Sequence, residues 1–229
     1  MIPLHDDNPT EINPLVTIAL IVTCALVFLY EVSLPERAGE TFVFHYGAIP
    51  ASIFGHEAAL SEDAVAVPVT LTLLTSMFLH GGWMHLIGNM LYLWIFGDNI
   101  ENALGHLRYL IFYLVCGVLA SLAHVFTTAA THGNMLVPSL GASGAISGVL
   151  GGYMLLFPGR RVRMLMGRGT AEMPAWVSIG VWFLFQVVAG MGLLGGGSQA
   201  GGVAYAAHVG GFVAGLVLVK VFAAGLRSR

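Results

Sequence analysis

Long apolar runs separated by short polar segments form the dominant pattern of this chain. Six runs reach or approach the roughly 17 residues that a membrane-spanning helix needs. They lie at about Pro14–Leu34, Trp83–Leu104, Leu107–Thr128, Ser143–Phe157, Pro174–Leu194 and Tyr205–Leu226. The pattern therefore predicts an all-α, polytopic membrane protein built as a bundle of six transmembrane helices. Because the number of spans is even, both termini are expected on the same side of the membrane.

The segment between the first two runs, residues 35–82, is moderately apolar but is interrupted by glycine, proline and charged residues. It is too broken to span a bilayer, and a loop that lies in the membrane interface is the better interpretation. No solenoid repeat or low-complexity tract is visible, so we predict a single membrane domain over residues 1–229, with about 14–226 embedded. The stretch before the first run has no Lys or Arg, so that run is expected to be retained rather than cleaved as a signal peptide.

Composition agrees with this pattern. Hydrophobic residues make up 57% of the chain and charged residues only 9%, whereas an ordinary soluble domain carries about 25% charged residues. A net charge of -3 gives no basic surface for nucleic acid. The expected partners are therefore the lipid bilayer and membrane proteins, and no nucleic acid.

The positive residues give the orientation. In the six-span arrangement, eight of the nine Lys and Arg residues fall on one side, which the positive-inside rule makes cytoplasmic: Arg108, Arg160, Arg161, Arg163, Arg168, Lys220, Arg227 and Arg229. Arg37 alone falls on the other side. Both termini are thus predicted to be cytoplasmic, and the loop 35–82 extracytoplasmic.

The fourth run is unusually short. Fifteen helical residues reach only about 22 Å, less than the roughly 30 Å of the hydrocarbon core. Since the arginine-rich end is cytoplasmic, the first residue, Ser143, must lie below the outer surface of the membrane. Irregular backbone precedes it, and such backbone is tolerated at this depth only inside protein or beside a water-filled cavity. Ser143 is therefore predicted to open into a wet pocket within the bilayer.

Two faces of small residues favour a serine–histidine pair. Glycines recur every four residues after Ser143, and the sixth run carries a stripe of small residues that contains His208. Such faces let transmembrane backbones approach closely, which would place Ser143 beside His208; simple helix packing is the alternative. An ionisable residue within a span indicates function, and imidazole can act as the general base of acyl transfer. With Glu172 the only acidic residue after position 101, a dyad without a carboxylate is expected.

The second run supplies candidate donors for an oxyanion hole. His85 and Asn89 are four residues apart and share one helix face, and the backbone N–H of Ser143 lies at a helix start. A mutual hydrogen bond between two buried polar groups is the alternative. His80 is interpreted as structural. No zinc-binding spacing links the histidines, so neither a metal nor a cofactor is expected.

Three segments together resemble the rhomboid intramembrane serine proteases: GASGAISGVLGGY, FLHGGWMHLIGNMLYLWIFGDNIE and AAHVGGFVAG. The resemblance runs from about Tyr46 to Gly215 and implies the bacterial six-span type in a prokaryotic plasma membrane, with the active site open to the extracytoplasmic side. It implies a serine endopeptidase that cleaves single-span membrane proteins through a covalent acyl-enzyme. The sequence does not fix the oligomeric state, and nothing in it requires an oligomer. Ser143 then matches the nucleophile and His208 the base; the oxyanion residues are His85, Asn89 and Ser143. Glu101 matches a structural acidic position.

Two features depart from the family pattern. Some members carry an aromatic residue four positions after the nucleophile, where this chain has Ser147, and others have a Trp-Arg pair in the first loop that is absent here. These departures concern substrate gating. The alternative function is a catalytically inactive rhomboid-like protein that binds transmembrane clients, and retention of all four site residues argues against it. A transporter is a third possibility, but no charged residue lies deep in the last three runs.

Overall fold

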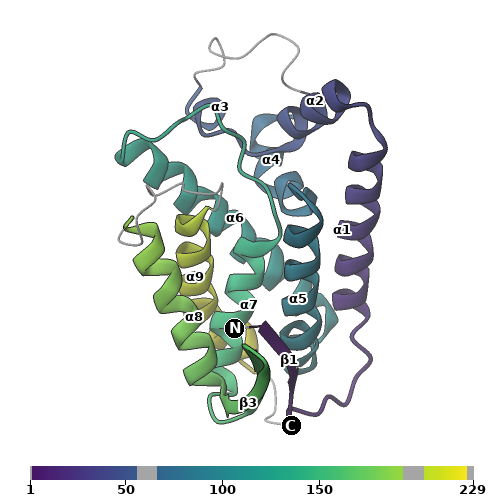
Figure 1. Ribbon diagram of the computed structural model, residues 1–229, viewed down its shortest axis with the longest axis vertical. Coiled ribbons are helices and arrows are strands. Elements are labelled where there is room, and N and C mark those ends of the chain that lie inside the picture. Colours follow the sequence, from purple (N-terminus) through teal and green to yellow (C-terminus); the bar gives the residue numbers. More distant parts are fainter. Residues whose placement is uncertain (1, 56–65, 193–203, 226–229) are drawn as a thin grey trace.

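A computed structural model describes residues 2–55, 66–192 and 204–225 (Figure 1). Six long helices form a bundle, with short helices over one end and a small sheet at the other (Figure 1). In chain order the elements are β1 (Ile2–Asp6), α1 (Leu15–Ser33), α2 (Glu36–Tyr46), α3 (Pro50–Ile53), α4 (Val69–Thr75), the 3-10 turn Ser76–Phe78, α5 (Trp83–Leu104), α6 (His106–Ala130), α7 (Ser143–Leu156), β2 (Arg161–Met166), β3 (Gly169–Pro174), α8 (Ala175–Gly190) and α9 (Tyr205–Ala223). The helical bundle that the sequence predicts is confirmed.

The outer helices present apolar faces to the surroundings. Three described helices, α1, α6 and α9, are long and apolar enough to cross a bilayer, while α7 and α8 are shorter, with 14 and 16 residues. Large apolar side chains stay exposed along single helix faces, among them Leu15, Ile18, Val22, Leu26 and Leu29 on α1. Spacings of three and four residues place them on one stripe. The protein is therefore a polytopic membrane protein whose outer faces suit lipid.

The short helix α7 forms the centre of the bundle. Every residue from Gly144 to Tyr153 is buried, and the helix contacts α5, α6, α8 and α9. Its glycines allow this, because a Cβ atom at Gly151 would collide with the backbone carbonyl of Phe212 on α9. The predicted packing of the two small-residue faces is confirmed, and it brings the backbones of α7 and α9 together.

An unpredicted three-stranded antiparallel sheet covers the arginine-rich end of the bundle. β2 and β3 form a hairpin in the segment expected to be a loop, and β1 pairs with β2. The sheet is held to the helices through Asp6, whose carboxylate accepts hydrogen bonds from Tyr153 Oη at 2.5 Å and Asn99 Nδ2 at 3.0 Å. Burial raises the pKa of Asp6, and the bond from Tyr153 opposes that shift.

Glu101 ties α1 to α5 at the same end, as the resemblance implied. The carboxylate is completely buried and accepts hydrogen bonds from the backbone N–H groups of Val16 and Thr17, each at 2.8 Å. The hydroxyl of Thr17 donates to it at 2.7 Å, and the His106 ring lies 2.6 Å away. These contacts confirm the structural position of Glu101.

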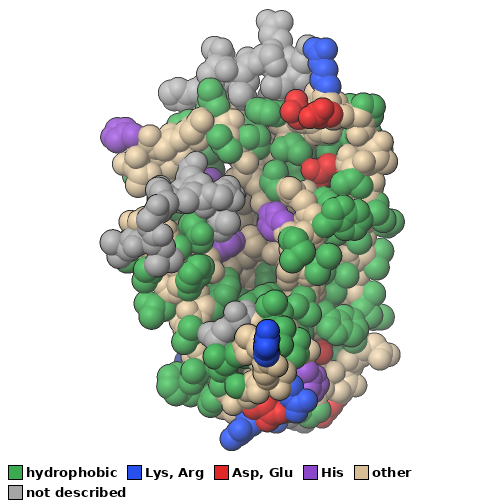
Figure 2. All heavy atoms as spheres, in the orientation of Figure 1, with side chains coloured by type: hydrophobic (Ala, Val, Ile, Leu, Met, Phe, Trp, Pro, Cys, Tyr) green, Lys and Arg blue, Asp and Glu red, His purple; other side chains and the backbone are tan. Residues whose placement is uncertain are grey.

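The segment 35–82 does not form a long span, which agrees with the sequence. It folds into α2, α3, α4 and the turn Ser76–Phe78 at the end opposite the sheet (Figure 1). Part of this expected loop, residues 56–65, lies outside the described residues, as do Arg227 and Arg229 of the predicted positive side. Figure 2 shows Lys and Arg side chains gathered at the sheet end of this face, consistent with the predicted asymmetry.

The connection from α6 descends into the bundle to reach the start of α7 (Figure 1). Ser139 exchanges two backbone hydrogen bonds with Ala48, at 2.8 and 3.0 Å, and the N–H of Gly141 donates to the carbonyl of Ser76 at 2.8 Å. This irregular segment is thus fixed by the short helices of the preceding loop. Ser143 begins α7 inside the bundle, after this irregular segment (Figure 1).

Candidate active site

Ser143 and His208 form a hydrogen-bonded pair between α7 and α9. Ser143 is the first residue of α7, and His208 lies in the first turn of α9. The Oγ atom of Ser143 lies 2.7 Å from Nε2 of His208. The close approach of the two glycine-lined helices brings together residues that are 65 positions apart in the chain. A serine hydroxyl at this distance can donate its proton to a neutral imidazole.

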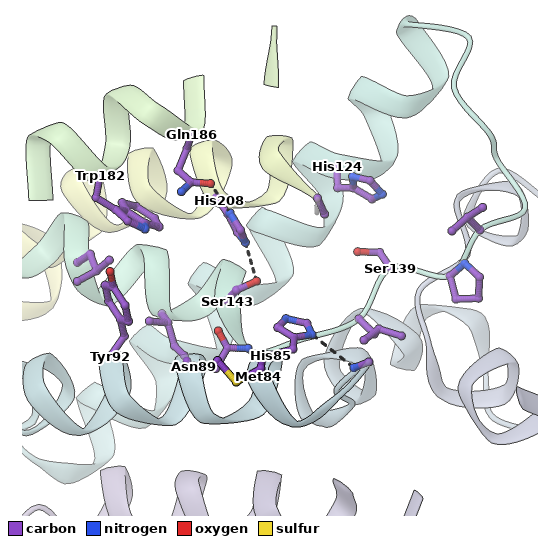
Figure 3. Close-up of a pocket in the computed structure, with 18 residues that line it drawn as sticks. Met84, His85, Asn89, Tyr92, His124, Ser139, Ser143, Trp182, Gln186 and His208 are labelled. Carbon is purple, nitrogen blue, oxygen red and sulfur yellow. Dashed lines mark hydrogen bonds between the residues drawn. The ribbon is translucent and has the colours of Figure 1, made fainter. Parts of the chain in front are cut away.

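A second helix, α8, contacts the other side of His208. The Nδ1 atom of His208 lies 2.8 Å from Oε1 of Gln186. The indole of Trp182, one turn earlier on α8, lies with its ring centre 6.1 Å from that of His208 and tilted by 35°. Figure 3 shows Gln186, His208 and Ser143 in a continuous hydrogen-bonded row. Neither α8 residue was predicted from the sequence.

Ser147 has a local role in α7. Its hydroxyl donates to the carbonyl oxygen of Ser143 at 2.6 Å, and its side chain is fully buried. In some members of the family the residue at this position is aromatic and stacks on the histidine; here Ser147 has no ring to stack on His208. Trp182 supplies the aromatic ring from α8 instead.

His85 and Asn89 extend from α5 on the opposite side of Ser143 (Figure 3). Asn89 is 8% exposed, and its Nδ2 donor has no hydrogen-bond partner among the described residues. The ring of His85 lies against Gly141: a Cβ atom there would stand 2.8 Å from Nε2 of His85 and 3.7 Å from Oγ of Ser143. Gly141 has a φ of 118°, which favours glycine. Two side-chain donors therefore converge on the space beside Ser143.

His80 lies behind His85 rather than in the pocket. Its side chain is completely buried, and its ring meets that of His85 edge to face with centres 5.2 Å apart. It packs against the residue that faces the pocket, which agrees with the structural interpretation.

The pair opens into a cavity of about 700 Å³ within the bundle. Figure 2 shows this face hollowed, with histidine side chains inside the hollow. The lining combines the polar groups of the site with apolar side chains such as Ile146 and Leu150. Figure 3 shows Tyr92 and Trp182 on the side of the pocket away from Ser139 and His124. His124 on α6 also lines the cavity, although no sequence pattern indicated it. Such a cavity, mostly apolar with a few convergent polar groups, is typical of a small-molecule or peptide site.

A metal site has no support in the part of the chain that the structure describes: no group of three His, Cys, Asp or Glu side chains there could hold an ion. His208 instead contacts Ser143 and Gln186, and His85 lies against Gly141 and His80.

Gln186 is the polar contact that the sequence analysis missed. A carboxylate was the expected kind of partner for His208, whereas the neutral amide of a glutamine also accepts a hydrogen bond. The available signal was a glutamine in an otherwise apolar run, VWFLFQVVAG, where a polar side chain needs a buried partner.

Together these features define a polytopic membrane protein that holds a hydrogen-bonded serine–histidine pair in an internal pocket. The comparison with known families agrees, because a family model described as the rhomboid domain matches residues 69–225. The chain belongs to the rhomboid family.

Its curated relatives come from mitochondria and from bacteria. Rhomboid protein 1, mitochondrial, of Saccharomyces cerevisiae is 31% identical over 158 residues, which cover 69% of this chain and 43% of the yeast protein. Rhomboid protease GluP of Bacillus subtilis is 39% identical over 99 residues, 43% of this chain and 18% of that protein. Presenilin-associated rhomboid-like protein, mitochondrial, of Bos taurus is 30% identical over 128 residues, which cover 56% of this chain and 33% of the bovine protein. The match spans less than half the length of each of these relatives.

Proposed function

We propose that this protein is a serine endopeptidase that hydrolyses peptide bonds of single-span membrane proteins in or near the bilayer. The observation that carries the proposal is the 2.7 Å contact between Ser143 Oγ and His208 Nε2 inside a cavity of the helix bundle. Membership of a family that includes a relative named as a protease supports it.

In the proposed reaction, Ser143 is the nucleophile and His208 the general base. Nε2 of His208 takes the hydroxyl proton as Oγ attacks the scissile carbonyl carbon. The tetrahedral intermediate collapses to an acyl-enzyme, and the imidazolium returns the proton to the leaving amine. Water then attacks the acyl carbon with His208 again as base, which releases the new carboxylate and restores Ser143.

The negative charge that develops on the carbonyl oxygen needs donors beside Ser143. We assign these to Asn89, to His85 and to the backbone N–H of Ser143, which has no acceptor within α7 because it lies in the first turn. The unpartnered Nδ2 of Asn89 supports this assignment. Preorganised donors of this kind lower the barrier because they need no reorganisation during the reaction.

We also propose a plasma membrane of a prokaryotic cell as the location, with the arginine-rich sheet in the cytoplasm and the pocket open to the extracytoplasmic side. The clustering of basic residues near β2 and β3 supports this orientation. A C-terminal fusion to a reporter that is active only in the cytoplasm should give a signal. Activity of a C-terminal reporter that works only outside the cytoplasm, with none from the cytoplasmic reporter, would contradict the orientation.

The central experiment compares the wild type, Ser143→Ala and Ser178→Ala in liposomes that hold a tagged single-span substrate. Ser178 is a matched control because it is buried on α8 and its hydroxyl donates to the local carbonyl of Ala175, at 3.2 Å. We expect cleavage by the wild type and by Ser178→Ala, and none by Ser143→Ala. A serine-directed fluorophosphonate should label the wild type and Ser178→Ala but not Ser143→Ala, and this readout needs no protein substrate.

Equal cleavage by Ser143→Ala would refute the assignment of the nucleophile. A folded wild type that binds substrates, yet neither cleaves them nor reacts with the fluorophosphonate, would favour the inactive client-binding alternative.

A further inference from the structure

Gln186 is a buried polar residue in an apolar helix. Its side chain is 6% exposed, and the α8 residues around it are aromatic or aliphatic. Burial of an amide without a hydrogen-bond partner is unfavourable, because the group loses its bonds to water. The hydrogen bond to His208, at 2.8 Å, therefore both satisfies the glutamine and fixes its direction.

The same hydrogen bond determines which nitrogen of His208 carries the proton. A neutral imidazole has one N–H donor and one acceptor nitrogen. When Oε1 of Gln186 accepts from Nδ1–H, the lone pair is on Nε2, the atom that faces the Ser143 hydroxyl at 2.7 Å. This is the tautomer in which His208 can act as a base towards Ser143.

From this geometry we propose that Gln186 is a positioning residue, which holds His208 in the Nδ1–H tautomer and in the ring orientation that serves Ser143. The proposal rests on the proposed function of that pair. Gln186 contacts neither Ser143 nor the reacting carbonyl carbon; it acts through the imidazole. When Nε2 gains a proton, the Gln186 carbonyl dipole keeps its bond to Nδ1–H and stabilises the positive ring.

A neutral amide suits this position better than a carboxylate. A charged side chain within a membrane protein is costly unless it is paired, whereas an amide accepts the same hydrogen bond without a charge to bury. Among the described residues, the other titratable side chains that line the cavity are His85, His124 and Tyr92, and none of these is a carboxylic acid. Gln186 thus takes the place that a carboxylate has in a serine–histidine–aspartate triad.

Trp182 completes the support from α8. It lies one turn before Gln186, so both side chains face His208 from the same side of one helix. The indole limits tilting of the imidazole, while Gln186 limits its rotation. Since Ser147 is bonded to the Ser143 carbonyl, the orientation of His208 depends on α8 rather than on the next turn of α7.

The test compares Gln186→Met, which keeps the length and volume but has no oxygen, with Gln186→Glu, which keeps an acceptor. Leu184→Met is the matched control, because Leu184 lies on the same helix and is 60% exposed. In liposomes we expect Gln186→Met to lose roughly tenfold to a hundredfold in kcat with KM within about twofold, since one orienting hydrogen bond is lost. Gln186→Glu should recover part of that loss, with the acid limb of its kcat/KM profile at higher pH because a carboxylate favours the imidazolium.

A second readout does not depend on turnover. Nitrogen-15 NMR of histidine-labelled protein, with the His208 signals assigned by their absence in His208→Asn, should show the proton on Nδ1 in the wild type. In Gln186→Met the two tautomers should become mixed, while Leu184→Met keeps the wild-type pattern.

Wild-type kcat in a folded Gln186→Met, or a proton on Nε2 of His208 in the wild type, would overturn the proposal. If the tautomer depends on Gln186 but no variant, the wild type included, cleaves any substrate, the positioning contact stands and the proposed protease function fails. If the wild type cleaves and Gln186→Met cleaves equally well, the function stands and the role of Gln186 fails.

Discussion

Replacement of Gly211 by alanine tests whether the close packing of α7 and α9 places the serine beside the histidine. Gly211 lies one turn after His208 on α9, and it faces the backbone of Gly144, the neighbour of Ser143 on α7. A Cβ atom at Gly211 would lie 2.0 Å from the Gly144 carbonyl oxygen, about 1.4 Å less than the 3.4 Å at which ordinary van der Waals contact begins. The obstacle is backbone, so no side chain can rotate away and the two helices must separate.

The magnitude follows from this displacement. Overpacking of a tight interface costs about 1–3 kcal/mol of unfolding free energy. The Ser143–His208 hydrogen bond, 2.7 Å long, joins the same two helices within one turn of the clash. A separation of about 1.4 Å would stretch it to roughly 4 Å, beyond hydrogen-bonding range. Misplacement of a reacting group by about 1 Å can cost 10²-fold in rate, so we expect kcat/KM to fall by about two orders of magnitude.

The assay measures cleavage in liposomes together with the thermal unfolding midpoint in detergent. Gly180→Ala is the matched control: Gly180 is also within a helix, and a Cβ atom there would meet nothing within 4 Å. It should keep wild-type activity and gain up to about 1 kcal/mol from helix propensity. Wild-type cleavage and an unchanged midpoint in Gly211→Ala would refute the link between glycine packing and the position of the pair.

Two further predictions concern the oxyanion donors and the sheet end. His85→Ala and Asn89→Ala should each leave the bundle folded and lower kcat by about 10²-fold, the usual effect of removing one oxyanion donor; unchanged turnover in both would remove them from that role. Burial raises the pKa of Asp6 above its ordinary 3.8, so the folded protein binds this proton more tightly than the unfolded chain does. The stability that this proton binding contributes is lost as pH rises from 3.8 through the raised pKa. Denaturant unfolding should therefore show the stability of Asp6→Asn relative to wild type increasing with pH across that window and constant outside it, whereas a pH-independent difference would contradict the buried carboxyl.

The helices and the serine–histidine contact were predictable from the sequence because they follow from two patterns: long apolar runs and regularly spaced glycines. Apolar runs of sufficient length predict spans almost independently of their neighbours. The glycines around Gly148 and Gly211 predict close approach, because large side chains at those positions would prevent it. The depth of Ser143 follows from the number of helical residues between it and the arginine-rich loop.

The sheet at the arginine-rich end was not predictable by the same reasoning. β2 and β3 contain two arginines, three methionines and one glutamate in mixed order, which does not give a clear strand periodicity. The segment was interpreted as a loop because its charges were used only to predict the orientation in the membrane. The residues of β1 that pair with β2 are at least 156 positions away from their partners, from Asp6 with Val162 upward, and the proline and register shift within β1 hide any strand periodicity. Asp6 joins the sheet to the bundle through hydrogen bonds from Asn99 and Tyr153. These residues are far from Asp6 in the chain, so the contacts could be predicted only after the helices had been packed together.

The contact between Gln186 and His208 could not be predicted from sequence patterns, because it depends on how α8 is rotated against α9. Small residues restrict which faces of α7 and α9 can meet, so that pair of helices has few alternative arrangements. α8 meets α9 through large side chains such as Trp182 and Phe183, which pack against His208 and Phe212. Large side chains allow several rotations of a helix, and only one of them brings Gln186 onto Nδ1 of His208. Packing of large side chains thus leaves the rotation of α8 open, and the hydrogen bond selects it, because another rotation would leave a buried amide unpaired.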